Sequence, residues 1–161
     1  MAKVEFKGMD EYVAKLEGLS NQSEKYIKEA IYKGTAVVMN SVKSSLQSIQ
    51  TDDTYHSKSG VRRGPTTVQK QGLLESLGIA DMRTDGHFIN AKIGFDGYNK
   101  VVTKKWTKGQ PNNMVARSVE SGTSWMRKQP FMRKAVNNAK ASCEETMRVS
   151  IDESIYAIMN K

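Results

Sequence analysis

The apolar side chains of this chain recur mainly at helical spacing. A first stripe predicts a short helix after Asp10, which ends at Gly18 and the pair Ser20 and Asn21. Asn21 and Glu24 have the spacing of a capping box, which predicts the start of a long second helix. Its stripe repeats every three or four residues: Ile27, Ile31, Gly34, Val38, Val42, Ser45 and Ile49. A similar stripe predicts a last helix from about Phe131 to near the C-terminus: Val136, Ala139, Cys143, Met147, Ile151, Ile155 and Ile158.

Gly34 stands in the middle of the second stripe. A glycine there costs about 1 kcal/mol relative to alanine, and we expect another stretch of backbone to approach closely at this point. The two long helices also present more apolar surface than a small sheet can cover. We therefore expect part of one apolar helix face to be buried by a neighbouring subunit.

Alternation of polar and apolar residues predicts three strands. They are residues 3–7, a segment from about Ser76 to Arg83, and a segment from Phe88 to Phe95 with alternate residues on one face. A hairpin turn at residues 84–86 joins the last two. We predict an α+β fold with a small, mainly antiparallel sheet packed against two long helices, and with long flexible loops. The length fits a single domain, residues 1–161.

Two segments, residues 51–71 and 96–111, show neither the helical nor the strand spacing of apolar residues, and we predict that they are loops. Segments of this length without structure are usually functional or are ordered by a partner. The first has no acid after Asp53, and no acid follows Asp96 until Glu120. We expect the loops either to face DNA or to become ordered on an assembly partner, although a solvated flexible loop remains open for the first. The residues concerned are Lys58, Arg62, Arg63, Lys70, Lys100, Lys104, Lys105, Trp106 and Lys108.

The net charge of +8 is concentrated in the middle of the chain. Residues 51–132 contain thirteen basic and seven acidic side chains, whereas the segments before and after are nearly neutral. A basic surplus in loops attracts a polyanion by long-range attraction and counterion release, whatever the sequence of that polyanion. One tryptophan is not a stacking platform for single strands, so the expected contact with nucleic acid is non-specific.

The sequence lacks the clustered acid–base groups on which catalysis depends. His56 and His87 have no partner at the spacing of a metal site or a catalytic triad. Three acidic pairs are neighbours along the chain and point in different directions: Asp52 and Asp53, Glu144 and Glu145, and Asp152 and Glu153. No phosphate-binding glycine loop or zinc-finger spacing is present. We therefore expect no enzyme, no catalytic residue, no cofactor and no metal site.

The single cysteine, Cys143, cannot form an internal disulfide, and its place in the last stripe favours a small buried hydrophobe over a reactive thiol. No apolar run approaches the roughly 20 residues of a membrane-spanning helix. The first residues also lack the apolar stretch of a secretory signal. We expect a protein that has no membrane partner and stays in the compartment where it is made.

Residues 112–136 are predicted to join two helices. Gly122 can supply the left-handed residue that ends the first helix, and Pro130 is expected in the first turn of the next. Trp125 and Phe131 are expected to be the large apolar anchors of the connection. The first of these helices is indicated by the spacing of Met114, Val115, Ser118 and Val119.

This stretch resembles the signature Y-A-x-x-x-E-x-G-T followed by P-F-L-R-P-A in a family of small neck and tail-completion proteins. The family occurs in long-tailed double-stranded DNA phages and their prophages, with the lambdoid siphophages as type members. Val115 departs from it where an aromatic is common, and Lys134 replaces the second proline. The matching segments are Ala116-Arg117, Val119-Glu120-Ser121-Gly122-Thr123 and Gln129-Pro130-Phe131-Met132-Arg133-Lys134-Ala135.

Other segments resemble the same family in their order. Val4-Glu5-Phe6-Lys7-Gly8 precedes the predicted first helix, and Gly72-Leu73-Leu74-Glu75-Ser76-Leu77 is similar to the family's G-x-L-x-x-S-I. A hairpin follows in both. The resemblance therefore covers most of the 161 residues.

The resemblance implies a structural virion protein at the head–tail junction, assembled in the host bacterial cytoplasm. It implies a homo-oligomeric ring, a hexamer or a dodecamer, around the DNA channel. The ring would contact a head-completion or connector protein on one side and the tail terminator or tail tube on the other, while double-stranded DNA passes through the lumen. The motif residues that the resemblance implies as subunit contacts are Glu120, Gly122, Thr123, Pro130, Phe131, Arg133 and Ala135.

Glu120 and Arg133 leave alternatives open, since they can pair with each other, pair across a subunit boundary or remain exposed. The function also leaves alternatives open. The main alternative is a small basic protein that binds nucleic acid non-specifically as a free regulator or chaperone. An enzyme of unrecognised type comes last, because the acid–base groups do not cluster.

Overall fold

The computed structural model describes residues 9–54, 60–85 and 88–160, and for residues 9 and 10 it describes the backbone alone. The elements follow in the order α1 (Met9–Ser48), α2 (Thr67–Ser76), β1 (Leu77–Asp85), β2 (Phe88–Phe95), α3 (Asn112–Ser121) and α4 (Met132–Met159). The predicted α+β class, with an antiparallel sheet and two long helices, is confirmed. The strand predicted over residues 3–7 lies outside the described residues. None of the described helices has the combination of length and apolar character that crossing a membrane requires.

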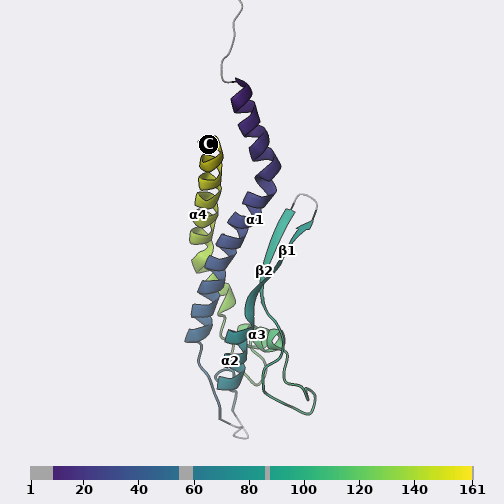
Figure 1. Ribbon diagram of the computed structural model, residues 1–161. Coiled ribbons are helices and arrows are strands. Elements are labelled where there is room, and N and C mark those ends of the chain that lie inside the picture. Colours follow the sequence, from purple (N-terminus) through teal and green to yellow (C-terminus); the bar gives the residue numbers. More distant parts are fainter. Residues whose placement is uncertain (1–8, 55–59, 86–87, 161) are drawn as a thin grey trace, which may run out of the picture.

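The two long helices, α1 and α4, lie antiparallel and side by side (Figure 1). Near the start of α4, Ser41 Oγ donates a hydrogen bond to the Ala135 carbonyl, 3.1 Å away. At the other end, Lys15 Nζ donates to the carbonyl of Met159 at 3.1 Å. These bonds fix the register, so the C-terminus of α4 lies beside the first turns of α1.

The predicted break between a first and a second helix is wrong, because α1 is continuous through Gly18 and Asn21. The Ser23 hydroxyl donates to the Ser20 carbonyl at 2.9 Å, so it bonds within the helix. Pairs of opposite charge four residues apart support both sides of these positions: Glu11 with Lys15, and Glu24 with Lys28. The local pairs outweigh the weak helix-breaking tendency of a single glycine.

Gly34 lies directly against side chains of α4. A Cβ atom at this position would lie 2.6 Å from Met147 Cγ and 3.1 Å from Cys143 Sγ. The expected close approach is therefore present, but side chains of α4 make it, not another backbone. Cys143 is half-buried at this contact, and burial together with Glu144 raises the pKa of its thiol. That environment favours the packing interpretation over a reactive thiolate.

The sheet is a single hairpin that lies along α1. β1 and β2 pair from Leu77 opposite Phe95 to Asp85 opposite Phe88, with an irregularity between Ala80 and Arg83. β2 has the predicted bounds, and β1 begins one residue later than predicted and runs on to Asp85. Half-buried positions alternate along β2 as predicted: Ile89, Ala91, Ile93 and Phe95. Because both strands contact α1, the hairpin covers the middle of that helix.

The core lies at one end of the molecule, where α2, α3 and the start of α4 meet the last turns of α1. Phe131 is 1% exposed, and its ring packs edge-on against Phe95 with 5.9 Å between the ring centroids. The other members of this cluster with the least exposure are Val42, Leu46, Leu73 and Val119. The opposite end of the α1–α4 pair leaves large apolar side chains exposed: Tyr12, Val13, Leu16, Ile155 and Tyr156.

The first predicted loop is shorter than residues 51–71, because α2 begins at Thr67. The Thr66 side chain accepts a hydrogen bond from the backbone N–H of Gln69, and the Gln69 side chain accepts one from the backbone of Thr66. The residues of this capping box stand in the sequence, but the helix that follows has only a weak apolar stripe, so helical spacing does not predict it.

Candidate functional site

Two basic segments that are far apart in the sequence lie side by side at the loop end of the molecule. The N–H of Arg62 donates to the carbonyl of Trp125, and the N–H of Arg127 donates to the carbonyl of Arg62, both at 2.9 Å. In this short parallel pairing Arg62 lies opposite Met126, so Arg63 and Arg127 follow on neighbouring segments. We call Arg62, Arg63, Arg127 and Lys128 the basic cluster. Arg62 is half-buried and the other three are exposed, so the cluster presents three accessible cations.

A tight turn after α3 holds one side of the basic cluster. Gly122 ends α3 with φ 75° and ψ 170°, a conformation that is essentially restricted to glycine. Thr123 and Met126 then exchange two backbone hydrogen bonds, of 2.9 and 3.3 Å. Met126 is buried, whereas Trp125 is 48% exposed. The prediction that Trp125 anchors this connection is therefore wrong, because the turn directs the neighbouring methionine into the core.

Gln129 ties this turn to the other basic segment. Its Nε2 donates to the carbonyls of Gln50 and Arg63, and its Oε1 accepts from the Gln50 N–H. The bonds are between 2.8 and 2.9 Å long. Gly64 makes room for them, since a Cβ there would lie 2.0 Å from the Gln50 carbonyl oxygen. One side-chain amide thus joins the end of α1, residues 60–66 and the turn before α4.

Asp52 and Asp53 are the acids nearest to the basic cluster in the first loop, and both are engaged in bonds to its backbone. Asp52 accepts from the Arg63 N–H at 2.9 Å, and Asp53 accepts from the Thr67 N–H at 2.8 Å. Hydrogen bonds from the Thr54 hydroxyl and then from the Arg63 and Thr54 N–H groups lower the pKa of Asp52 to about 2. The two carboxylates therefore close the loop and keep Arg63 in place.

Lys70 has a structural role, although the sequence placed it among the DNA-facing candidates. Its Nζ donates to the carbonyls of Gln47 and Ile49, at 2.7 and 2.9 Å. Gln47 lies in the last turn of α1, whose carbonyls have no partner within the helix, and Ile49 is the first residue after it. The lysine therefore caps the C-terminus of α1. Lys58, another of the candidates, lies outside the described residues.

The second basic loop, residues 96–111, has internal bonds of its own. Thr103 and Trp106 exchange backbone hydrogen bonds of 3.0 and 3.1 Å, and Asn99 bonds to Gln110 at its base. Lys105 Nζ lies 5.5 Å from the centre of the half-buried Trp106 ring, in cation–π geometry. The lysines of the loop are all exposed: Lys100, Lys104, Lys105 and Lys108. Both basic loops lie at the end of the molecule away from the start of α1 and the end of α4 (Figure 1).

The motif residues mostly stabilise the chain itself. The Glu120 carboxylate accepts from the backbone N–H of Met132 at 2.8 Å and of Arg133 at 3.1 Å, so it caps α4. Within the described residues no ion pair joins the side chains of Glu120 and Arg133, and Arg133 is exposed. Pro130 lies just before α4, whose N-cap is Phe131, and not in its first turn as predicted. The other motif residues lie in the turn or in the core: Gly122, Thr123, Phe131 and Ala135.

Among the residues that the structure describes, no three histidine, cysteine or acidic side chains come together as a metal site would require. Glu145 and Asp152 instead pair with Arg148 on the surface of α4. His56 and His87 lie outside the described residues. The candidate site is therefore the set of exposed lysine and arginine side chains at the loop end, which can bind phosphate groups.

Comparison with known proteins identifies no relative, since no family matches the chain and no match was found among the curated proteins or the solved structures. Sequence reasoning did not place Arg127 and Lys128 in the site. The only signal was a second pair of adjacent cations, and its pairing with residues 62 and 63 depends on the tertiary fold.

Proposed function

We propose that this chain is a structural component of the head–tail junction in a long-tailed double-stranded DNA phage or prophage. In this role, copies of the chain assemble around the DNA channel between the head connector and the tail. The loop end makes non-specific contacts with DNA phosphates, and the helical end makes contacts with neighbouring protein. The motif resemblance between residues 116 and 135 suggests the family, and the two ends of the molecule supply the physical support.

The observation that carries the proposal is the gathering of exposed cations at the loop end of the molecule, opposite a group of exposed apolar side chains at the free end of the helix pair. Exposed cations from three separate segments gather at the loop end, around residues 63, 104 and 127. Exposed apolar side chains gather at the free end of the α1–α4 pair, where Tyr12 is 51% and Tyr156 is 70% exposed. A protein that bridges a DNA channel and a protein wall requires both kinds of surface.

The expected chemistry at the loop end is electrostatic. Exposed lysine and arginine side chains release counterions when they neutralise phosphates, so the contact weakens steeply with salt. Phosphate contacts carry no direct sequence information. Such contacts hold DNA in a channel and still allow a genome of any sequence to pass.

The apolar residues at the helical end fit a contact between subunits. Large apolar side chains grouped on one surface mark protein interaction sites, whereas single ones do not. Tyr12, Leu16 and Tyr156 lie near the bond from Lys15 to Met159, so they occupy one end of the helix pair. A second copy or an adjacent ring protein would bury them.

Light scattering of the purified protein, with and without a DNA duplex at low and moderate salt, tests the proposal. A discrete ring supports it, and so does a monomer that binds duplex weakly and only at low salt, because such a part assembles on a connector that is already built. A monomer or dimer that binds duplex tightly at moderate salt overturns it. That result would favour the main alternative, a free regulator that binds nucleic acid. The basic cluster is consistent with that function as well.

A further inference from the structure

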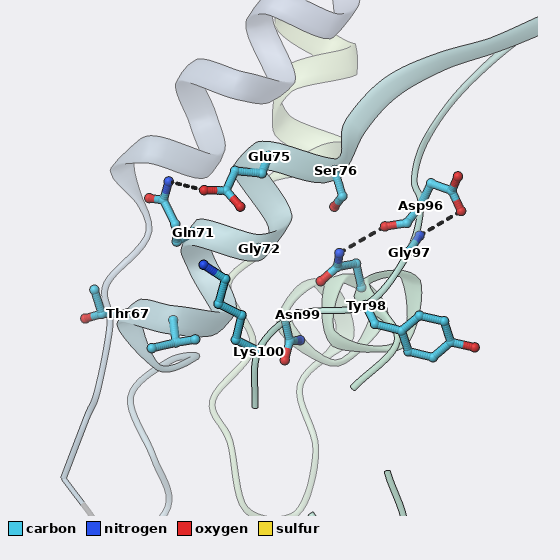
Figure 2. Close-up of a pocket in the computed structure, with 12 residues that line it drawn as sticks. Thr67, Gln71, Gly72, Glu75, Ser76, Asp96, Gly97, Tyr98, Asn99 and Lys100 are labelled. Atoms are coloured by element: carbon cyan, nitrogen blue, oxygen red, sulfur yellow. Dashed lines mark hydrogen bonds between the residues drawn. The ribbon is translucent and has the colours of Figure 1, made fainter. Parts of the chain in front are cut away.

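A cavity of about 450 Å³ lies between α2 and residues 96–100, and none of the basic-cluster residues lines it. Figure 2 shows α2 with Gln71, Gly72 and Glu75 on one side and the segment with Asn99 and Lys100 on the other. Asn112, the first residue of α3, also contributes to the wall. The cavity is therefore a separate feature, built where α2, the second basic loop and α3 meet.

Two deeply buried asparagines line this cavity, and each has one amide atom without a partner among the described residues. Asn99 is 4% and Asn112 is 2% exposed. Asn99 Oδ1 accepts from the Val101 N–H, and Asn112 Nδ2 donates to the Asp96 carbonyl, both at 2.9 Å. These bonds fix the orientation of both amides. Asn99 Nδ2, a donor, and Asn112 Oδ1, an acceptor, are left over.

Burial of an amide atom without a hydrogen-bond partner lowers stability, so a donor and an acceptor left in one cavity wall require an explanation. Sites that hydrogen-bond a ligand keep such groups in place before the ligand arrives. The backbone here is well fixed, since the Asn99 N–H donates to Gln110 and the Asn112 N–H donates to Gly97, at 2.9 and 3.0 Å. The two amides are thus preorganised.

Gly72 allows α2 to pack directly against both asparagines. A Cβ atom at Gly72 would lie 2.6 Å from Asn99 Cβ and 3.1 Å from Asn112 Oδ1. Lys100 is exposed and points from its segment towards α2 (Figure 2). The two free amide atoms have almost no accessible surface, so a ligand reaches them only after a local shift of the groups that cover them.

The free donor and acceptor match an amide group, whose C=O accepts from Asn99 Nδ2 and whose N–H donates to Asn112 Oδ1. A polypeptide backbone presents this pair at every residue except proline. Three charged residues line the cavity, two of them acidic: Glu75, Asp96 and Lys100. The Asp96 carboxylate turns away from α2 and accepts from the Gly97 N–H, whereas the Glu75 carboxylate lies on α2 and accepts from Gln71 Nε2 at 2.8 Å (Figure 2). The negative charge of Glu75 favours a basic side chain of a ligand and disfavours a phosphate beside it.

We propose that the cavity between α2 and residues 96–100 binds an extended peptide segment of another protein, with its backbone amide on Asn99 and Asn112 and a lysine or arginine beside Glu75. The exposed Val68 and Tyr98 also line the site and offer apolar contact to a neighbouring side chain of the segment. The inference does not depend on the proposed role in a phage neck, because it uses none of the basic cluster.

The test follows the side-chain amide signals of Asn99 by NMR during titration of the full chain with the capped peptide acetyl-Ala-Lys-Ala-Leu-amide. We expect saturable shifts with a Kd on the order of 1 mM for such a short probe. Asn99→Asp keeps the Oδ1 that accepts from Val101 but removes the free donor. It should weaken binding, read from the backbone signals of α2, by at least about tenfold. The matched control is Asn113→Asp. Asn113 follows Asn112 in α3, is exposed and does not line the cavity.

Glu75→Lys provides an independent variant on the exposed face of α2 if Asn99→Asp does not fold. It should weaken binding of the lysine peptide and strengthen binding of acetyl-Ala-Glu-Ala-Leu-amide. The proposal is overturned if the lysine peptide moves no cavity signal at about 10 mM, well above the expected Kd. Equal binding by Asn99→Asp and the unmodified protein overturns it too. Shifts caused by oligothymidylate and not by the peptides would assign the cavity to nucleic acid instead.

Discussion

The Glu120 carboxylate accepts a hydrogen bond of 2.8 Å from the backbone N–H of Met132 and thereby joins the last turn of α3 to the first turn of α4. The bond crosses the whole connection between the two helices. The positive end of the α4 dipole and the free N–H groups of its first turn both favour a negative charge there. Glu120 therefore stabilises the connection between α3 and α4 within one chain, whether or not it contacts another subunit.

Glu120→Ala should lower the free energy of unfolding by about 1–2 kcal/mol, the range for removal of a helix cap. Urea denaturation of the variant measures this change. Glu144→Ala, on the exposed surface of α4, is the control and should change stability by less than about 0.5 kcal/mol. If the two variants are equally stable, Glu120 does not act as a cap in solution.

Gly122→Ala should cost about 1–3 kcal/mol, because the residue has φ 75° and its new Cβ would lie 2.9 Å from Lys128 N. Gly97→Ala is the comparison, since Gly97 also has a positive φ, 64°, but open space around the Cβ position. We expect about 1 kcal/mol for Gly97→Ala, measured by the same denaturation. A loss at Gly122 no larger than the loss at Gly97 would mean that the turn relaxes around Lys128.

Lys70→Met should destabilise the fold by about 1–2 kcal/mol, since two carbonyls at the end of α1 lose a charged donor. Lys104→Met should leave stability nearly unchanged, because Lys104 is an exposed loop residue. Thermal unfolding of both variants distinguishes the capping lysine from the lysines available for phosphate. Equal midpoints for the two would contradict the capping role.

Asp52 should make stability depend on acidity. Its folded pKa of about 2 lies below the ordinary aspartate pKa of 3.8, so the folded state binds the proton more weakly than the unfolded chain. The stabilisation is therefore complete above the unfolded pKa and is lost as the pH falls from about 4 to about 2. Melting temperatures of the parent protein and Asp52→Asn across this range measure it.

The Asp52→Asn profile should be flatter than that of the parent between these limits. Asp81→Asn, on the exposed part of β1, is the matched control. Parallel profiles for the parent and Asp52→Asn would show that the bonds to Thr54 and Arg63 do not hold the carboxylate in solution.

Replacement of the three exposed cations of the basic cluster by glutamine, at Arg63, Arg127 and Lys128, should reduce the salt dependence of duplex binding. Each phosphate contact contributes roughly −0.9 to the slope of log K against log salt concentration, so the slope should become shallower by up to about 3. Fluorescence anisotropy at several salt concentrations measures it. Arg148→Gln is the control, because Arg148 is exposed but paired with Glu145 and Asp152 on α4. An unchanged slope in the triple variant would place the phosphate contacts elsewhere.

The sequence by itself determined the elements whose signal is local. The stripes of α1 and α4, the alternation of β2 and the spacing around Val119 follow from period alone, because these side chains face the same core in successive turns or residues. The α+β class followed from those periods. The capping box at Thr66 was also legible, and the loop prediction missed it because α2 has little amphipathic character.

The tertiary structure decided what depends on residues far apart in the chain. Packing between distant segments decides which groups of α4 lie against Gly34, the capping roles of Glu120 and Lys70, and the pairing of Arg62 with Arg127. Asn99 and Asn112, each with one unpaired amide atom, line the same cavity for the same reason. A sequence pattern records which side a residue faces, but only packing fixes which distant groups meet there and which remain free to bind a partner.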